Sequence, residues 1–144
     1  MSAAGRHLPQ LLGEARRWFE EALLDALARA GAEPVSPTQA AVFAALDEDG
    51  TTVSELARRM GVTRQTTHQA VHGLITLGLL EQSPDPASAR RRLIRRTPSG
   101  ERAHEQAVRT LARLEEVLAE RIGPDQVAAL RAALEAEWGD PPVV

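Results

Sequence analysis

The residues best suited to binding chemistry in this sequence are arginines, and they are concentrated in its middle third. Residues 51–102 contain nine arginines and four acidic residues, a net charge of +5, whereas the rest of the chain carries −8 and the whole chain −3. A polyanion responds to the positive charge that faces its phosphates, so the negative total does not oppose nucleic-acid binding. Arginine offers a planar fork that suits phosphate and guanine. A G+C-rich genome would produce the same preference for arginine over lysine, so the residue type carries less weight than its location.

Two histidines, His68 and His72, are spaced so that both imidazoles lie on one face of a helix. Such a pair can hold a metal ion, but no acidic or cysteine ligand lies nearby and two ligands rarely suffice. Contact with DNA, or simple exposure to solvent, is the preferred interpretation. We therefore predict no metal and no cofactor.

Catalytic machinery is missing from the sequence. The chain has no cysteine and no lysine, and it shows no glycine-rich phosphate loop, paired catalytic carboxylates or metal-ligand cluster. The prediction is that the protein is not an enzyme. The lack of tyrosine and the presence of only four aromatic residues also argue against base-stacking platforms for RNA or single strands.

Apolar segments long enough for a membrane are also missing. No apolar run approaches the roughly 18 residues that span a bilayer. Residues 1–7 lack the apolar stretch of a signal peptide. A cytoplasmic location is expected.

The outer parts of the chain are predicted to be helical. Apolar residues recur at helical spacing from Leu8 to Ala30, and Gly31 ends that helix. Ser36 and Gln39 form a capping box that opens a second helix, with Val42, Phe43 and Leu46 on its buried face. Thr97 and Pro98 open a long helix, and a last helix follows Gly123 and Pro124. The predicted core face of the long helix comprises Ala103, Ala107, Val108, Leu111, Leu114, Leu118 and Ile122.

Two short helices in the middle of the chain are joined by a tight turn. Thr52 and Glu55 form a capping box for the first helix, and Gly61 ends it. Thr63 caps the second helix, which runs from Arg64 to about Leu77. This arrangement is typical of a helix-turn-helix, whose second helix offers its first turns to the DNA major groove.

The predicted DNA-contacting face of that second helix is polar. Arginine pairs with guanine, glutamine with adenine, and threonine with phosphate or a thymine methyl group. The candidate recognition residues are Thr63, Arg64, Gln65, Thr67, His68, Gln69 and His72, whereas Ala70, Val71 and Leu74 are expected to face inward.

A basic hairpin follows the recognition helix. Residues 79–83 and 92–96 are predicted strands, and the prolines of residues 83–86 predict a turn or loop, which gives a hairpin too long for a tight turn. Arg90, Arg91 and Arg92 are the candidate DNA contacts of this wing, with Arg95 and Arg96 close behind. A solvated charged face is the alternative, but five arginines within seven residues favour phosphate contact.

Residues 36–104 resemble the MarR family of winged helix-turn-helix transcriptional regulators. The resemblance rests on Ser54-Glu55-Leu56-Ala57, Gly61-Val62-Thr63, Gly78-Leu79-Leu80, Asp85-Pro86 and Thr97-Pro98-Ser99-Gly100. It implies a mainly α fold with a small β-hairpin, in which a winged helix-turn-helix of residues 36–98 is flanked by dimerisation helices of residues 6–31 and 99–140. It further implies a bacterial homodimer that binds a pseudo-palindromic operator in double-stranded DNA.

The sequence departs from the family pattern at two places. Family wings usually carry Asp-x-Arg near the tip, where this chain has Ser88-Ala89-Arg90. Gly73 occupies a position in the recognition helix where a large charged residue is common, and a glycine inside a helix costs about 1 kcal/mol relative to alanine. Either a close backbone contact requires Gly73 or this helix is slightly soft.

The resemblance also suggests a ligand pocket between the dimer helices and the DNA-reading part, with Trp18 and Phe43 as candidate lining residues. The alternative is that both are ordinary core residues. The resulting hypothesis is a repressor released by a small apolar or aromatic effector. A winged-helix module for protein contacts, and a DNA binder without ligand that is controlled by a partner protein, remain the alternatives.

Overall fold

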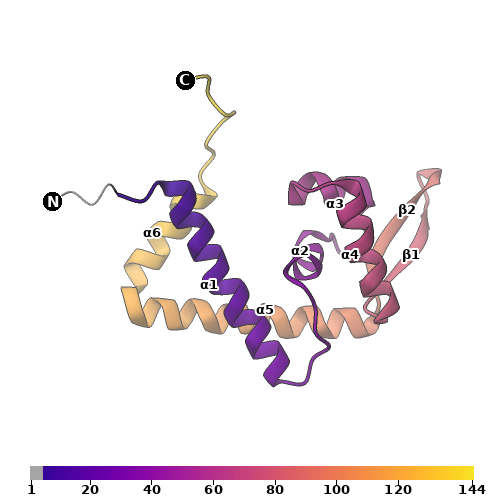
Figure 1. Ribbon diagram of the computed structural model, residues 1–144, viewed down its shortest axis with the longest axis horizontal. Helices are drawn as coiled ribbons and strands as arrows, with labels where there is room; N and C mark the ends of the chain where they lie inside the picture. Colours follow the sequence, from indigo (N-terminus) through magenta and orange to yellow (C-terminus); the bar gives the residue numbers. More distant parts are fainter. Residues whose placement is uncertain (1–4) are drawn as a thin grey trace.

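The computed structural model describes residues 5–144, and it contains a mainly α-helical chain with one β-hairpin, as predicted (Figure 1). Residues 1–4, which carry part of the signal-peptide argument, lie outside the described residues. The elements are α1 (Leu8–Arg29), α2 (Pro37–Ala45), α3 (Val53–Met60), α4 (Arg64–Thr76), β1 (Leu80–Asp85), β2 (Ser88–Arg96), α5 (Pro98–Ile122) and α6 (Pro124–Glu135).

The long helix α5 connects two groups of elements (Figure 1). Helices α1 and α6 pack against one part of α5, and the lobe formed by α2, α3, α4 and the hairpin stands at its N-terminal end. None of the helices in residues 5–144 has the length and apolar content needed to cross a membrane.

Local capping explains why the helices begin where they do. The Ser36 side chain accepts a hydrogen bond from the Gln39 amide, and the Gln39 side chain accepts one from the Ser36 amide, so the predicted capping box of α2 is confirmed. Thr63 caps α4 as predicted, by accepting from the Thr66 amide. The predicted capping box at α3 is only half correct. Thr52 accepts from the Glu55 amide as predicted, but the Glu55 carboxylate accepts hydrogen bonds from Arg58 and Arg59 instead of completing the cap.

The tight turn between α3 and α4 depends on Gly61. Its φ of 67° lies in the left-handed region, which glycine adopts without steric cost. The Gly61 and Val62 amides donate to the carbonyl oxygens of Arg58 and Ala57, at 3.3 and 3.2 Å. These two bonds satisfy the last carbonyls of α3 and set the angle at which α4 leaves the turn.

The fully buried apolar core lies in the lobe of α2, α3, α4 and the hairpin. Its members come from all of these elements and from the turn after α4: Val42, Leu46, Leu56, Ala70, Val71, Leu74, Leu79, Leu80 and Ile94. By contrast, α1 and α6 bury no residue fully, and α5 buries only Gly100.

Several apolar side chains of α5 and α6 are exposed in the single chain. The prediction that Val108 and Ile122 lie on a buried face is wrong here, because they are 50% and 48% exposed. Leu130 and Leu134 of α6 are exposed to a similar degree, and Trp138 more so. No element of the described chain covers these side chains.

The hairpin is longer than predicted. Strand β1 continues through Pro84 to Asp85, β2 begins at Ser88, and only Pro86 and Ala87 form the turn, so the predicted loop at residues 83–86 is wrong. Pro84 pairs with Arg92, and the register shifts between Pro84 and Asp85. Each strand of a two-stranded sheet has one free edge, where the missing proline N–H breaks no ladder bond.

The junction from β2 to α5 is held closely against the end of α4. Thr97 caps α5 by accepting from the Gly100 amide, and its hydroxyl donates to the Gly78 carbonyl oxygen at 2.6 Å. A Cβ on Gly100 would lie 1.9 Å from the Leu79 carbonyl oxygen. The glycine of the Thr97–Gly100 motif is therefore required by a close backbone approach.

Candidate nucleic-acid interface

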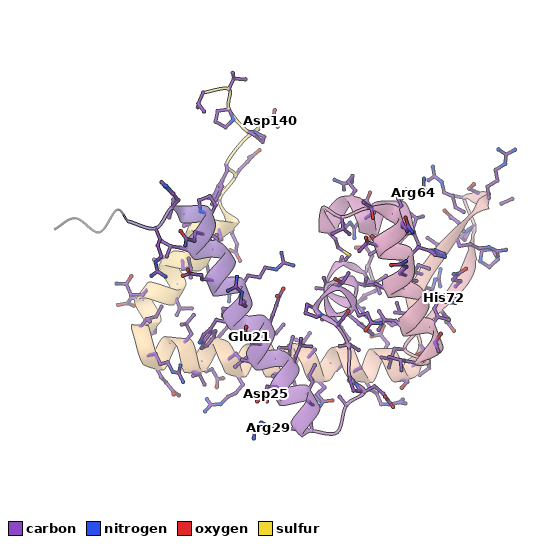
Figure 2. The ribbon with its side chains drawn as sticks, in the orientation of Figure 1. Glu21, Asp25, Arg29, Arg64, His72 and Asp140 are labelled. Atoms are coloured by element: carbon purple, nitrogen blue, oxygen red, sulfur yellow. The ribbon has the colours of Figure 1, made fainter. Side chains whose placement is uncertain are left out.

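The polar face of α4 is exposed, as predicted for a recognition helix. Arg64, Gln65, His68, Gln69 and His72 are all solvent-exposed, as is the capping residue Thr63. In Figure 2, Arg64 and His72 project from the N-terminal and C-terminal parts of α4, on the side that carries the hairpin. The inward positions Ala70, Val71 and Leu74 are buried as predicted.

Thr67 is an exception, and the prediction that it contacts DNA is not supported. Its side chain is fully buried, and its hydroxyl donates to the Thr63 carbonyl oxygen at 3.0 Å. Thr67 lies three and four residues before Ala70 and Val71, so helical spacing places it on the core face. That spacing was the signal that could have identified it, and the exposed threonine of this turn is Thr66.

The structure brings the wing arginines and the recognition helix together. A groove of about 440 Å³ lies between the start of α3, the helix α4 and the hairpin. Arg64 and His68 line it from α4, and Arg90, Arg91 and Arg92 line it from β2. The three wing arginines are exposed, so their guanidinium groups are available to an anionic partner.

Arg96 does not belong to this surface. Its side chain is 4% exposed, and Nη2 donates to the carbonyl oxygens of Phe43 and Leu46 at 2.9 and 3.3 Å. Nη1 lies 3.7 Å from a Glu101 carboxylate oxygen. Arg96 therefore joins the end of β2 to the end of α2, and the prediction that it faces phosphate is wrong. Arg95 is half-buried and packs over Gly50.

An ion-pair cluster that the sequence did not reveal fixes α3 to α2. Arg59 makes two hydrogen bonds to the Asp47 carboxylate at 3.0 Å, one to Glu55, and one to the Ala45 carbonyl oxygen. Hydrogen bonds from Arg58 and Arg59 lower the pKa of Glu55 to about 2, and Arg59 likewise lowers the pKa of Asp47. The cluster holds the first helix of the helix-turn-helix in place behind the groove.

Gly73 is explained by a contact from α2. A Cβ at this position would lie 2.6 Å from Nε2 of Gln39, the residue whose side chain completes the cap of α2. The close approach of α2 to α4 therefore uses the space that a side chain on Gly73 would fill.

The two recognition-helix histidines lie side by side. Their ring centroids are 6.1 Å apart and the ring planes differ by 21°. Within residues 5–144 there is no group of three or more histidine, aspartate or glutamate side chains arranged to hold a metal ion.

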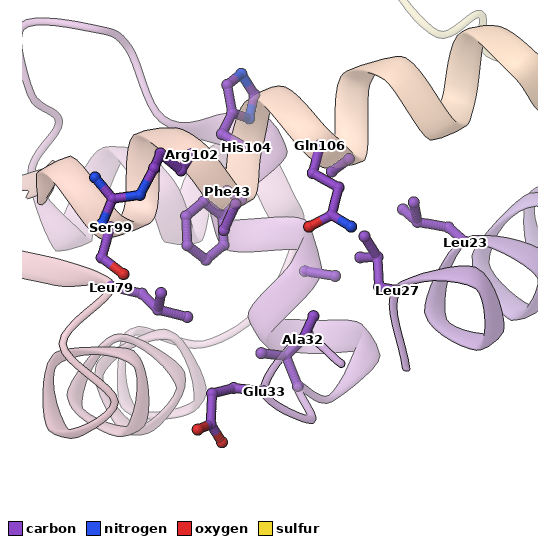
Figure 3. A pocket seen from close by; sticks show the side chains of 14 residues that line it. Leu23, Leu27, Ala32, Glu33, Phe43, Leu79, Ser99, Arg102, His104 and Gln106 are labelled. Carbon is purple, nitrogen blue, oxygen red and sulfur yellow. The ribbon is translucent and has the colours of Figure 1, made fainter. Parts of the chain in front are cut away.

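A second cavity, of about 290 Å³, lies where the lobe meets α1 and α5 (Figure 3). Phe43 and Leu79 line it from the lobe, Leu27 from α1, and Arg102 and His104 from α5. Burial lowers the pKa of His104, and the nearby charge of Arg96 lowers this pKa further. Phe43 lines this cavity, and its role in an effector pocket stays a prediction.

Trp18 does not line this cavity. Its ring meets the ring of Phe19 edge-on, with centroids 4.9 Å apart, and the Arg121 guanidinium lies 5.9 Å from its centre. The prediction for Trp18 is wrong, because it packs between α1 and the far part of α5 rather than beside the lobe.

A helix-turn-helix followed by an arginine-bearing hairpin defines a winged helix-turn-helix. Residues 33–91 match the model of the MarR family. A MarR-family regulator from Rhodococcus sp. RHA1 shares 22% identity over 91% of this chain and 94% of its own, with a TM-score of 0.72. The reduced form of MarR from E. coli shares 20% identity over 91% and 96%, with a TM-score of 0.75. The repressor CouR, solved with a 23-mer DNA duplex, shares 26% identity over 89% of both chains, with a TM-score of 0.73.

The matched residues cover the lobe that carries the groove, and the solved structures show that the chain has the winged helix-turn-helix fold of MarR-family regulators. No curated protein sequence matches the chain significantly.

Proposed function

We propose that this chain is a sequence-specific regulator of transcription that binds double-stranded DNA and acts as a repressor in the cytoplasm, rather than an enzyme. One observation carries the proposal. Arg64 and His68, from the exposed polar face of α4, line the same groove as the three exposed arginines of the hairpin. A recognition helix in the major groove and a wing on the adjoining backbone need this arrangement.

Relatives of similar fold support DNA as the partner. CouR was solved bound to a DNA duplex, and a MepR mutant from S. aureus, with a TM-score of 0.60 to this chain, was solved bound to an oligodeoxyribonucleotide. In this chain, we assign base contacts to Arg64, Gln65 and Gln69, and backbone or minor-groove contacts to Arg90, Arg91 and Arg92.

The proposal includes a homodimer formed by residues 6–31 and 99–140. The support is the apolar surface left open on these segments, which includes Leu8, Val108, Ile122, Leu130, Leu134 and Trp138. Burial of such a surface against a second copy removes it from water and favours association. A dimer would present two copies of α4 about 34 Å apart, to successive major grooves of a pseudo-palindromic operator.

We further propose that the cavity at Phe43 takes a small apolar or aromatic effector that releases the DNA. The cavity is lined both by the lobe and by α1 and α5, so a ligand there contacts both sides of the junction. A ligand that binds better when the two lobes of the dimer are wrongly spaced for DNA would lower DNA affinity.

The test is a salt titration of fluorescence anisotropy on the duplex upstream of the protein's own gene, with a random duplex as control. Tight, salt-sensitive binding that prefers the upstream duplex supports a sequence-specific regulator. Equal binding to both would support DNA binding and place the operator elsewhere. Binding to neither at low salt would contradict the proposal and favour a protein-contact module.

A further inference from the structure

Two imidazoles lie beside the most basic surface of the molecule. His68 and His72 are both exposed, and their rings stack with centroids 6.1 Å apart. His68 also lines the groove between α3, α4 and the hairpin. The exposed face of α4 that we propose for DNA contact therefore also carries two side chains of a type that ordinarily gains or loses charge between pH 5 and 8.

The charged side chains that line the groove with His68 are almost all positive, and His72, outside the groove lining, is exposed and stacks on His68. Arg64 contributes from α4, and Arg90, Arg91 and Arg92 contribute from β2. The acidic residue of the groove is Glu55 of α3, and its carboxylate is already engaged by Arg58 and Arg59. Strand β1 contributes the uncharged Gln82. No acidic side chain among those lining the groove is therefore left to pair with a protonated imidazole.

DNA would change this environment. A bound duplex brings phosphates to the groove, and an opposite charge within about 4–6 Å favours the charged form of a titrating group. Because the two rings are one helical turn apart on the face that meets the duplex, both come close to phosphates or base edges. A group that gains a proton on binding makes that binding tighter as the pH falls.

We propose that His68 and His72 take up protons when the protein binds DNA, so that DNA affinity increases as the pH falls from 8 to 6. This inference rests on the proposed DNA binding, and it adds a dependence on acidity to it. It makes the DNA-reading surface itself, rather than the effector cavity, the element that senses acidity.

The experiment measures the dissociation constant of the full chain on the upstream duplex at pH 8, 7 and 6, at constant ionic strength and with a chelator present. The wild type is expected to bind about tenfold more tightly at pH 6 than at pH 8. The double variant His68→Gln/His72→Gln should still bind but lose most of this increase. His7→Gln is the control for loss of an exposed imidazole away from the groove. Because His7 lies in the segment proposed for dimerisation, light scattering first checks that this variant is as dimeric as the wild type, and its pH response should then equal that of the wild type.

Calorimetry in two buffers of different ionisation enthalpy gives an independent count of protons. Near neutral pH the wild type should take up protons on binding DNA, and the double variant should take up fewer. Circular dichroism checks that the variant, whose changes are both on exposed positions, is folded. An equal pH response or equal proton uptake in wild type and double variant would overturn the inference while leaving DNA binding intact. A lack of binding at every pH would overturn the proposed function and this inference with it.

Discussion

The exposed wing arginines differ sharply from Arg96, although all lie on the same strand. Arg90, Arg91 and Arg92 are exposed and can bind an anion, whereas the guanidinium of Arg96 donates hydrogen bonds to two backbone carbonyl oxygens. The sequence shows only a run of arginines. Position along β2 accounts for the difference, because Arg96 lies at the end of β2 that meets α2, whereas the three wing arginines lie nearer the turn.

We predict that Arg90→Ala/Arg91→Ala weakens binding to every duplex. Each lost phosphate contact should reduce the slope of log K against log salt by about 0.9, so the double variant, which removes two contacts from each protomer of the proposed dimer, should flatten the slope by about 3.6. The measurement is a salt titration of anisotropy. Arg17→Ala/Arg29→Ala removes the same charge from exposed positions on α1 and, once light scattering shows that it is still dimeric, should leave the slope nearly unchanged. An unaltered slope in the wing variant would refute the wing assignment.

We predict a different result for the glutamines of α4. Gln65→Ala and Gln69→Ala should each cost about 1–3 kcal/mol on the preferred duplex and much less on a random duplex, because bidentate base contacts carry sequence information. The salt slope should hardly change. Competition binding with single-base variants of the duplex checks this, and equal losses on all sequences would show that these residues do not read bases.

Among the elements, α2 and α4 are coupled through one side chain. Gly73→Ala should gain about 1 kcal/mol of helix propensity but displace the Gln39 amide from its cap, a loss of similar size. We predict almost no net change in the free energy of unfolding in the wild type. In a Gln39→Ala background, the same change should stabilise by about 1 kcal/mol. A denaturant-unfolding cycle tests this, and the same effect in both backgrounds would rule out the coupling.

The ion-pair cluster at α3 makes the lobe sensitive to acid. The pKa of Glu55 falls from 4.5 to about 2 on folding, so Glu55 stabilises the folded state above pH 4.5 and loses this effect as the pH falls toward 2. Asp47, whose pKa is also lowered, acts in the same direction. Glu55→Gln should flatten the loss of thermal stability between about pH 5 and pH 2. Glu21→Gln, at an exposed position of α1, is the control and should retain the wild-type pH profile.

Element ends were predictable because their causes are local. Ser36, Thr63 and Thr97 cap helices through atoms three residues away, and Gly61 ends α3 by its own backbone conformation. The hairpin differs from the prediction because Pro84 lies in a two-stranded sheet, where each strand has a free edge that needs no N–H donor. Glu55 was assigned to its helix cap, but two arginines one turn later compete more strongly for its carboxylate.

At the scale of the whole molecule, the groove could be predicted from the sequence, but the roles of single side chains could be predicted only in part. Recognition helix and hairpin are adjacent in sequence, so their shared groove follows from the order of elements. The positions of Trp18 and Arg96 depend on contacts across 50 residues or more, which spacing does not encode. The exposure of Val108 and Ile122 could not be predicted from one chain's pattern either, since nothing in residues 5–144 covers these two side chains.

We predict that the chain is a dimer and that α6 contributes to its interface. Light scattering after size exclusion should show a dimer at micromolar concentration. Leu130→Glu/Leu134→Glu should give a folded monomer, because it places charge on the apolar face that a second copy would cover. Leu77→Glu changes a leucine of comparable exposure at the end of α4, outside the segments proposed for dimerisation, and this variant should remain dimeric. A stable wild-type monomer would contradict the proposed architecture.

The most direct test of the central claim, that α4 and the hairpin form one DNA-reading surface, is a hydroxyl-radical footprint on the preferred duplex. The wild type should protect two half-sites about one helical turn apart together with flanking segments on either side. The Arg90→Ala/Arg91→Ala variant, at a concentration that restores binding, should lose the flanking protection and keep the centre. A footprint that is identical for both proteins would contradict the account, because the wing would then lie away from the DNA.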